Sequence, residues 1–239
     1  MKKYIIDSVK TEKFEMNYLK FGTGDKTFIM LPGMSLTSVL DSADGIVSAY
    51  NCLCSDYTVY LFDRVKNVRE GYSIEDMAED TVDAIKELGL NDLYIFGVSQ
   101  GGMIALCMAV HHSELVKKMI VASSFSRHNV LMENIFSEWI NYAENEQIKE
   151  LNHSFYINLF SKEYIEKYGA ILESFENNGT ADDCKKFIVI AKACLNFDIY
   201  DELDKIKCPV LVIGSNNDRV LSGESSVEIA EKIGCELYM

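Results

Sequence analysis

The sequence predicts an α/β fold in which helices cover both faces of a mostly parallel, doubly wound sheet. Three features of its 239 residues lead to this prediction. Short, continuous apolar runs recur along the chain, as is typical of strands that are buried on both faces. Segments with helical periodicity separate several of these runs. The order strand, helix, strand at this spacing favours right-handed crossovers between neighbouring parallel strands.

The expected strands begin near the N-terminus. Residues 4–9 and 14–21 are predicted to form an antiparallel hairpin at the sheet edge. After the final parallel strand, a helix is expected over residues 227–233 and a last strand from Cys235. The buried parallel strands are predicted at the apolar runs TFIML, TVYLF, LYIF, MIVAS and PVLVI, which occupy residues 27–31, 58–62, 93–96, 119–123 and 209–213.

The clearest helix follows Ser73. Serine is a good N-cap residue, and Asp76 lies three residues later, where a carboxylate can complete a capping box. Gly89 is expected to end the helix, because glycine readily adopts the left-handed conformation that follows a helix C-terminus. The apolar stripe of this helix consists of Ile74, Met77, Ala78, Val82, Ile85 and Leu88.

Residues 125–204 break the alternation, because helical periods dominate throughout them. Half of the aromatic residues of the chain also lie in this segment. We therefore expect an all-helical insertion between two strands of a core that residues 1–124 and 205–239 form. Most of the aromatic side chains are expected to pack within the insertion itself, and a few to line a pocket that faces the sheet.

The charge and the cysteine content exclude several classes of function. With 23 basic and 37 acidic side chains the net charge is −14, so the surface is expected to repel nucleic acids and anionic membranes. No apolar run approaches the ~18 residues of a membrane-spanning helix. The seven cysteines follow no disulfide spacing, and Cys52 and Cys54 are too close for a usual zinc pair. We expect a cytoplasmic protein without metal or cofactor.

The strongest chemical signal is the sequence GVSQGG, which follows the run at 93–96 and precedes an apolar helix. A serine on such a sharp strand-to-helix turn adopts a strained backbone conformation. Small residues two positions before and after it avoid clashes, and Gly97 and Gly101 occupy these positions. The turn would expose the Ser99 hydroxyl at the carboxyl end of the sheet, beside the positive end of the helix dipole. Ser99 is therefore the candidate nucleophile.

The chain resembles the α/β-hydrolase family over nearly its whole length. The resemblance rests on GVSQGG, on LPGM at residues 31–34, on an acidic residue after PVLVI, and on a helical insertion where the family carries its lid. It implies an oxyanion hole formed by the backbone N–H groups of Met34 and Gln100. The family often has histidine where this chain has Pro32, a departure that affects the shape of the loop more than its main-chain donor.

The resemblance also implies an acid and a histidine. Asp218 matches the family's G-x-x-x-D pattern after PVLVI and would orient the histidine and stabilise its charged form. In the family the histidine follows this acid, but no histidine follows Asp218 here. The helix that begins at the turn would carry two histidines about 18 Å from its start, one follows MIVAS, and one lies in the insertion. The four are His111, His112, His128 and His153.

In the family the histidine comes after the last strand, and a final helix follows it. This sequence ends at Met239, before either element. Two interpretations stand: a C-terminal tail of about 25–35 residues is missing, or the protein is a short form that has lost its base. Without the final helix, apolar parts of the strands would face water. The form that ends at Met239 is then expected to be a poor catalyst, and either to dimerise through that face or to melt at low temperature.

Together these features predict a serine hydrolase that acts on a small carboxylic ester or a related acyl substrate through an acyl-enzyme at Ser99. A thioesterase, an acyltransferase and a C–C bond hydrolase are alternatives with the same nucleophile. A different class of function is a catalytically silent protein of this fold that binds a small hydrophobic ligand. The expected partner in each case is a small molecule.

Overall fold

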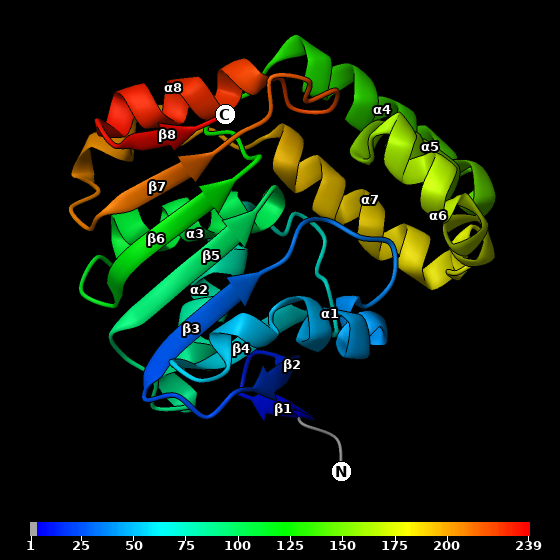
Figure 1. Cartoon of the computed structure of the whole chain (residues 1–239). Helices are drawn as coiled ribbons and strands as arrows, with labels where there is room; N and C mark the ends of the chain where they lie inside the picture. The colour runs from blue at the N-terminus through cyan, green and yellow to red at the C-terminus, as the bar shows by residue number, and fades with distance from the viewer. Residues whose placement is uncertain (1–3) are drawn as a thin grey trace.

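Eight strands form one sheet in the computed structural model, which describes residues 4–239 (Figure 1). The strands are β1 (Tyr4–Lys10), β2 (Glu15–Phe21), β3 (Lys26–Leu31), β4 (Tyr57–Val65), β5 (Leu93–Val98), β6 (Val116–Ala122), β7 (Val210–Ile213) and β8 (Glu236–Tyr238). Their order across the sheet is β1-β2-β4-β3-β5-β6-β7-β8. β1 pairs antiparallel with β2, and β2 with β4; the other neighbouring pairs are parallel. The predicted edge hairpin and the mostly parallel sheet are confirmed.

Helices cover both faces of this sheet. The helices are α1 (Ala43–Ala49), α2 (Ile74–Glu87), α3 (Gln100–His111), α4 (Val130–Glu144), α5 (Ile148–Leu159), α6 (Lys162–Phe175), α7 (Ala181–Leu195) and α8 (Gly223–Ile233), with 3₁₀ turns at Val39–Ser42, Asn51–Leu53 and Tyr200–Lys205. On one face, Val47 of α1 packs with Phe28 and Val59 of the strands. α2 and α3 lie on the opposite face (Figure 1). Among residues 4–239, no helix is both long enough and apolar enough to span a membrane.

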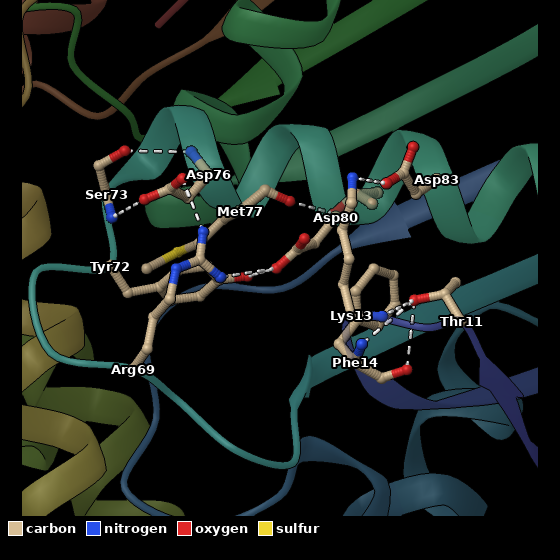
Figure 2. A network of polar contacts seen from close by, with 11 residues as sticks. Thr11, Lys13, Phe14, Arg69, Tyr72, Ser73, Asp76, Met77, Asp80 and Asp83 are labelled. Atoms are coloured by element: carbon tan, nitrogen blue, oxygen red, sulfur yellow. Dashed lines mark hydrogen bonds and ion pairs between the residues drawn. The ribbon is translucent and has the colours of Figure 1, made fainter.

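α2 begins as the sequence predicts, and a polar network fixes its first turns (Figure 2). Ser73 and Asp76 form a reciprocal capping box, with side-chain-to-amide distances of 3.0 Å in both directions. Arg69, in the preceding loop, contacts the carboxylates of Asp76 at 2.7 Å and Asp80 at 3.5 Å. Tyr72 donates a hydrogen bond to the buried Asp80 at 2.6 Å. These contacts tie the loop after β4 to the helix.

The chain leaves the sheet after β6 and returns at β7, and α4 to α7 fill the interval. In Figure 1 these helices lie beyond the carboxyl ends of the parallel strands. Aromatic side chains pack among them: the ring of Trp139 stacks on those of Phe136 and Phe155, with centroids 5.2 and 4.1 Å apart. The Trp139 indole donates to the Ser154 hydroxyl at 3.0 Å. These aromatic side chains belong to a hydrophobic cluster that continues into the core beneath the sheet.

Candidate active site

Ser99 occupies the turn between β5 and α3. Its backbone has φ 53° and ψ −120°, a conformation that residues with side chains rarely adopt. The Ser99 N–H donates to the Ala122 carbonyl on the neighbouring β6 at 2.9 Å, which anchors the turn to the sheet. Because α3 starts at Gln100, the positive end of its helix dipole lies at the turn that carries the Ser99 hydroxyl. The turn has the strained conformation expected of a strand–nucleophile–helix junction.

Glycines make this turn possible. A β-carbon on Gly97 would lie 2.3 Å from the Gly101 carbonyl oxygen, and one on Gly101 would lie 1.9 Å from the Leu31 carbonyl oxygen. Both distances are far inside van der Waals contact, so neither position accepts a side chain without a backbone shift. The missing side chains let α3 approach the end of β3. Gly33, in the loop after β3, consequently lies beside Ser99, and a β-carbon on Gly33 would be 3.4 Å from that of Ser99.

Ser99 opens into a cleft of about 870 Å³. Asp218, from the loop after β7, lines the same cleft. One wall of the cleft is the loop at residues 215–221, and another is the junction of α5 and α6 at residues 158–162. The cleft therefore brings together the predicted nucleophile, the predicted acid and the helical insertion.

The carboxylate of Asp218 is held by its own loop. Its Oδ1 accepts hydrogen bonds from the backbone N–H groups of Val220 and Leu221 at 2.9 and 2.8 Å. The neighbouring Arg219 reaches the facing wall instead, where its guanidinium donates to the Phe160 carbonyl. Main-chain donors therefore orient the acid, and Arg219 links its loop to the insertion.

The two candidate oxyanion donors come from different segments. Gln100 is the first residue of α3, and its side chain is buried. Met34 is half-buried in the loop after β3, and its N–H donates to no acceptor within residues 4–239. The adjoining Gly33 approaches the nucleophile, since a β-carbon on it would lie 3.9 Å from Ser99 Oγ. Both segments therefore adjoin Ser99, one in sequence and the other in space.

The sequence analysis missed one residue beside this site, Arg64. Its guanidinium donates hydrogen bonds to the Pro32 and Gly33 carbonyl oxygens, each at 3.0 Å. It also donates to the side-chain oxygen of Gln100 at 2.8 Å. The available signal was an arginine two residues after the apolar run TVYLF, where a charge is costly unless it has partners.

None of the four histidines lines the cleft beside Ser99. His111 is exposed at the last residue of α3. The other three contact carboxylates elsewhere, in the pairs His112–Glu79 at 2.7 Å, His128–Glu133 at 3.2 Å and His153–Glu176 at 2.8 Å. Within residues 4–239, the structure brings a serine and an acid together in one cleft without a histidine.

Known proteins resemble this chain in sequence. The Caulobacter segnis protein named "Putative carbamate hydrolase RutD" is 29% identical over 164 residues, which cover 68% of this chain and 61% of that protein. A protein of the same name from Rhizobium rhizogenes is 25% identical over 208 residues, which cover 82% of this chain and 79% of that protein. The match with the Caulobacter segnis protein thus spans less than two thirds of its length.

Solved structures have the same fold. MGS-M2, an α/β hydrolase from a Medee basin deep-sea metagenome library, matches 97% of this chain and 87% of its own with a TM-score of 0.84 and 21% identity. The enol-lactonase from Burkholderia xenovorans LB400 matches 97% of this chain and 90% of its own, with a TM-score of 0.84 and 19% identity. A family model for the α/β hydrolase fold matches residues 26–239, which include the Ser99 turn and the Asp218 loop. As its sequence motifs indicated, the chain belongs to the α/β-hydrolase family.

Proposed function

We propose that the protein is a serine hydrolase that cleaves a small carboxylic ester or a related acyl substrate through an acyl-enzyme at Ser99. The observation that carries the proposal is the strained turn at Ser99, which opens into the same cleft as Asp218. Such a backbone conformation costs about 1–3 kcal/mol and clusters at functional sites. Here it points a hydroxyl-bearing residue into a cleft beside the N-terminus of α3.

In the proposed first step, Ser99 Oγ attacks the carbonyl carbon of the substrate while a base takes the hydroxyl proton. The carbonyl oxygen becomes an oxyanion that accepts hydrogen bonds from the N–H groups of Met34 and Gln100. When the tetrahedral intermediate collapses, the leaving group departs with the proton and the acyl group stays on Ser99. Water then attacks the acyl-enzyme in the same way and releases the acid.

Asp218 is proposed to orient the base and to stabilise its charged form. The two backbone hydrogen bonds on Oδ1 support this role, because they fix the carboxylate in the cleft before substrate binds. The four histidines of the chain lie outside the cleft lining, so none of them is proposed as the base. We assign no base within residues 4–239.

The size and walls of the cleft support a small substrate. Its volume of about 870 Å³ falls within the range of about 300–1,000 Å³ that is usual for small-molecule sites. Leu159 and Phe160 contribute apolar wall from the insertion, which would serve as the lid. The names of the relatives and of one structural neighbour refer to carbamate and enol-lactone bonds. Both bonds join an acyl carbonyl to a heteroatom leaving group, as esters do, and this shared chemistry supports an acyl substrate.

A second candidate function is the binding of a small hydrophobic ligand without catalysis. The observation in its favour is that no histidine of the described chain lines the cleft. An unactivated serine hydroxyl is a weak nucleophile, so a protein without a base would keep the cleft and lose the reaction.

A fluorophosphonate probe separates these two functions. The protein, expressed from its complete reading frame, is expected to be labelled at Ser99, as located by peptide mass mapping, and Ser99→Ala is expected to abolish the label. Ser174→Ala is the matched control, because Ser174 is exposed on α6 outside the cleft lining. Binding of a hydrophobic ligand without labelling would favour the second function. A label on Ser123, which also lines the cleft, would contradict the assignment of the nucleophile.

A further inference from the structure

The guanidinium of Arg64 joins the two backbone segments that carry the candidate oxyanion donors. Arg64 is the penultimate residue of β4. Its Nη2 donates to the carbonyl oxygens of Pro32 and Gly33 at 3.0 Å each, and its Nε donates to Gln100 Oε1 at 2.8 Å. These partners are 31 to 36 residues away in sequence. One side chain thus connects the loop after β3 to the first residue of α3.

Neutral groups, rather than a carboxylate, hold this guanidinium. Among residues 4–239, no ion pair involves Arg64, and the carboxylate of Asp63 accepts from the Ser38 hydroxyl and from the Arg64 backbone N–H. Burial lowers the pKa of the Arg64 guanidinium, although the charge of Asp63 opposes that shift. Desolvating a cation costs free energy that an apolar side chain of similar size would not. This cost points to a role for Arg64 beyond packing.

We infer that Arg64 is a positioning residue that aims the Met34 N–H at the oxyanion. The Gly33 carbonyl and the Met34 N–H belong to one peptide group, which is planar and trans, so the two point in opposite directions. Because Arg64 holds the Gly33 oxygen, the Met34 N–H points away from Arg64 and is free of acceptors within residues 4–239. Gly33 flanks the Ser99 side chain. The inference rests on the proposed function, since it concerns the oxyanion of that reaction.

The same guanidinium holds the Gln100 side chain in place. The oxygen of the Gln100 amide accepts from Arg64, and its nitrogen donates to the sulfur of Cys194 on α7 at 3.2 Å. Burial raises the pKa of the Cys194 thiol to about 12, so the sulfur is an uncharged acceptor. With both ends of its amide occupied, the Gln100 side chain stays in the interior, and its backbone N–H at the start of α3 donates to no acceptor within residues 4–239. Arg64 thereby keeps both donors in place before substrate binds, without touching the substrate.

Two substitutions test this role. Arg64→Met keeps much of the side-chain volume and removes all of the hydrogen bonds, whereas Arg64→Lys keeps the charge but cannot reach three acceptors in one plane. Loss of a whole oxyanion donor costs about 10²–10³ in kcat, so we expect its misplacement in Arg64→Met to lower kcat by about 10- to 100-fold. KM should change by less than about twofold, because the donors act mainly in the transition state. Arg64→Lys is expected to recover part of the loss.

Arg69→Met is the matched control. Arg69 is also an arginine in the segment around the end of β4, but its partners Asp76 and Asp80 lie on α2, away from the cleft. Its loss is expected to lower the melting temperature and to leave kcat unchanged. A second readout needs no turnover: the backbone NMR order parameters of the Gly33 and Met34 amides should fall in Arg64→Met and stay at the wild-type values in Arg69→Met.

The outcomes separate this inference from the function on which it rests. If the wild type hydrolyses esters and Arg64→Met retains kcat, or if the order parameters of the Gly33 and Met34 amides are unchanged in Arg64→Met, the inference is overturned. A wild type that hydrolyses no ester and takes no label at Ser99 contradicts the proposed function, and the order-parameter measurement then decides alone whether Arg64 holds the loop. If Arg64→Met does not fold, Arg64→Lys takes its place in the same comparison, with a smaller loss of kcat expected.

Discussion

The backbone of Gly101 lies so close to that of Leu31 that a β-carbon on Gly101 would fall 1.9 Å from the Leu31 carbonyl oxygen. This contact joins the first turn of α3 to the end of β3. It therefore sets how closely Ser99, at the start of α3, approaches the loop after β3 that carries the Met34 N–H. The site depends on a packing contact that only glycine allows.

Replacing this glycine should damage the fold at the site. We expect Gly101→Ala to destabilise the protein by about 1–3 kcal/mol or more, the usual cost of overpacking, because the obstacle is backbone and cannot rotate away. Gly169→Ala is the matched control: Gly169 lies within α6, and a β-carbon there would meet nothing within 4 Å. That change should stabilise by about 0.5–1 kcal/mol, since glycine is unfavourable inside a helix. Urea unfolding measures the free energy of unfolding of both variants. A Gly101→Ala protein as stable as the wild type would show that Gly101 does not pack tightly against the Leu31 carbonyl.

Phe160 should limit the length of the acyl chain. Its half-buried ring lines the cleft from the α5–α6 junction and stacks on Tyr164 with centroids 4.6 Å apart. Phe160→Ala would open that wall, so longer chains could bury more apolar surface, at about 0.8 kcal/mol for each added CH₂. We expect the ratio of kcat/KM for p-nitrophenyl octanoate to that for the acetate to rise several-fold. Phe175→Ala is the control: it removes an exposed ring outside the cleft lining and should leave this ratio unchanged. If the ratio is also unchanged in Phe160→Ala, the Phe160 wall does not contact the acyl chain.

The stability of the protein should fall in acid partly through Asp76. Burial raises the pKa of this carboxyl, but the hydrogen bonds from Ser73 and the ion pair with Arg69 outweigh it and hold the pKa below its usual range. A carboxyl whose pKa is lower in the folded than in the unfolded chain stabilises the fold above the unfolded pKa of about 3.9. That contribution disappears as the pH falls through the folded pKa.

Asp76→Asn tests this linkage. The variant should be less stable than the wild type at pH 7, and the difference should shrink as the pH is lowered from 5 to 3. Free energies of unfolding in urea across that range provide the measurement. Glu231→Gln, on the exposed surface of α8, controls for the loss of one negative charge. A difference between Asp76→Asn and the wild type that stays constant with pH would contradict the predicted protonation.

Local signals explain why α2 and the Ser99 turn were predictable from the sequence. The start of α2 is encoded within four residues, because Ser73 and Asp76 cap each other. Its end is encoded by Gly89, whose φ of 65° is one that glycine adopts without strain. The turn at Ser99 is likewise specified by glycines two positions away on each side. In each case, the residues that determine the geometry are neighbours in the chain.

Features that depend on distant contacts were not predictable in this way. α1 went unpredicted, because it is only seven residues long and its apolar side chains form no extended stripe. Arg64 was overlooked because its partners are 31 to 36 residues away, and no local pattern reports them. The pairing of Asp218 with the α5–α6 junction across one cleft also depends on how the insertion packs over the sheet. The sequence indicated the Asp218 loop and the helical insertion separately. That they form two walls of one cleft is visible only in the folded structure.

The sharpest test of Ser99 as the nucleophile is the rate of p-nitrophenyl ester hydrolysis by Ser99→Ala beside the wild type. Both proteins are expressed from the complete reading frame, and circular dichroism verifies that the variant is folded. Loss of the nucleophile is expected to lower kcat by about 10⁴–10⁶-fold, the range found when a catalytic triad is disabled. The melting temperature should stay close to that of the wild type, because the substitution removes one half-buried hydroxyl and no packing. Undiminished turnover by a folded Ser99→Ala protein would show that another group performs the attack, and Ser99 would then be only a residue of a tight turn.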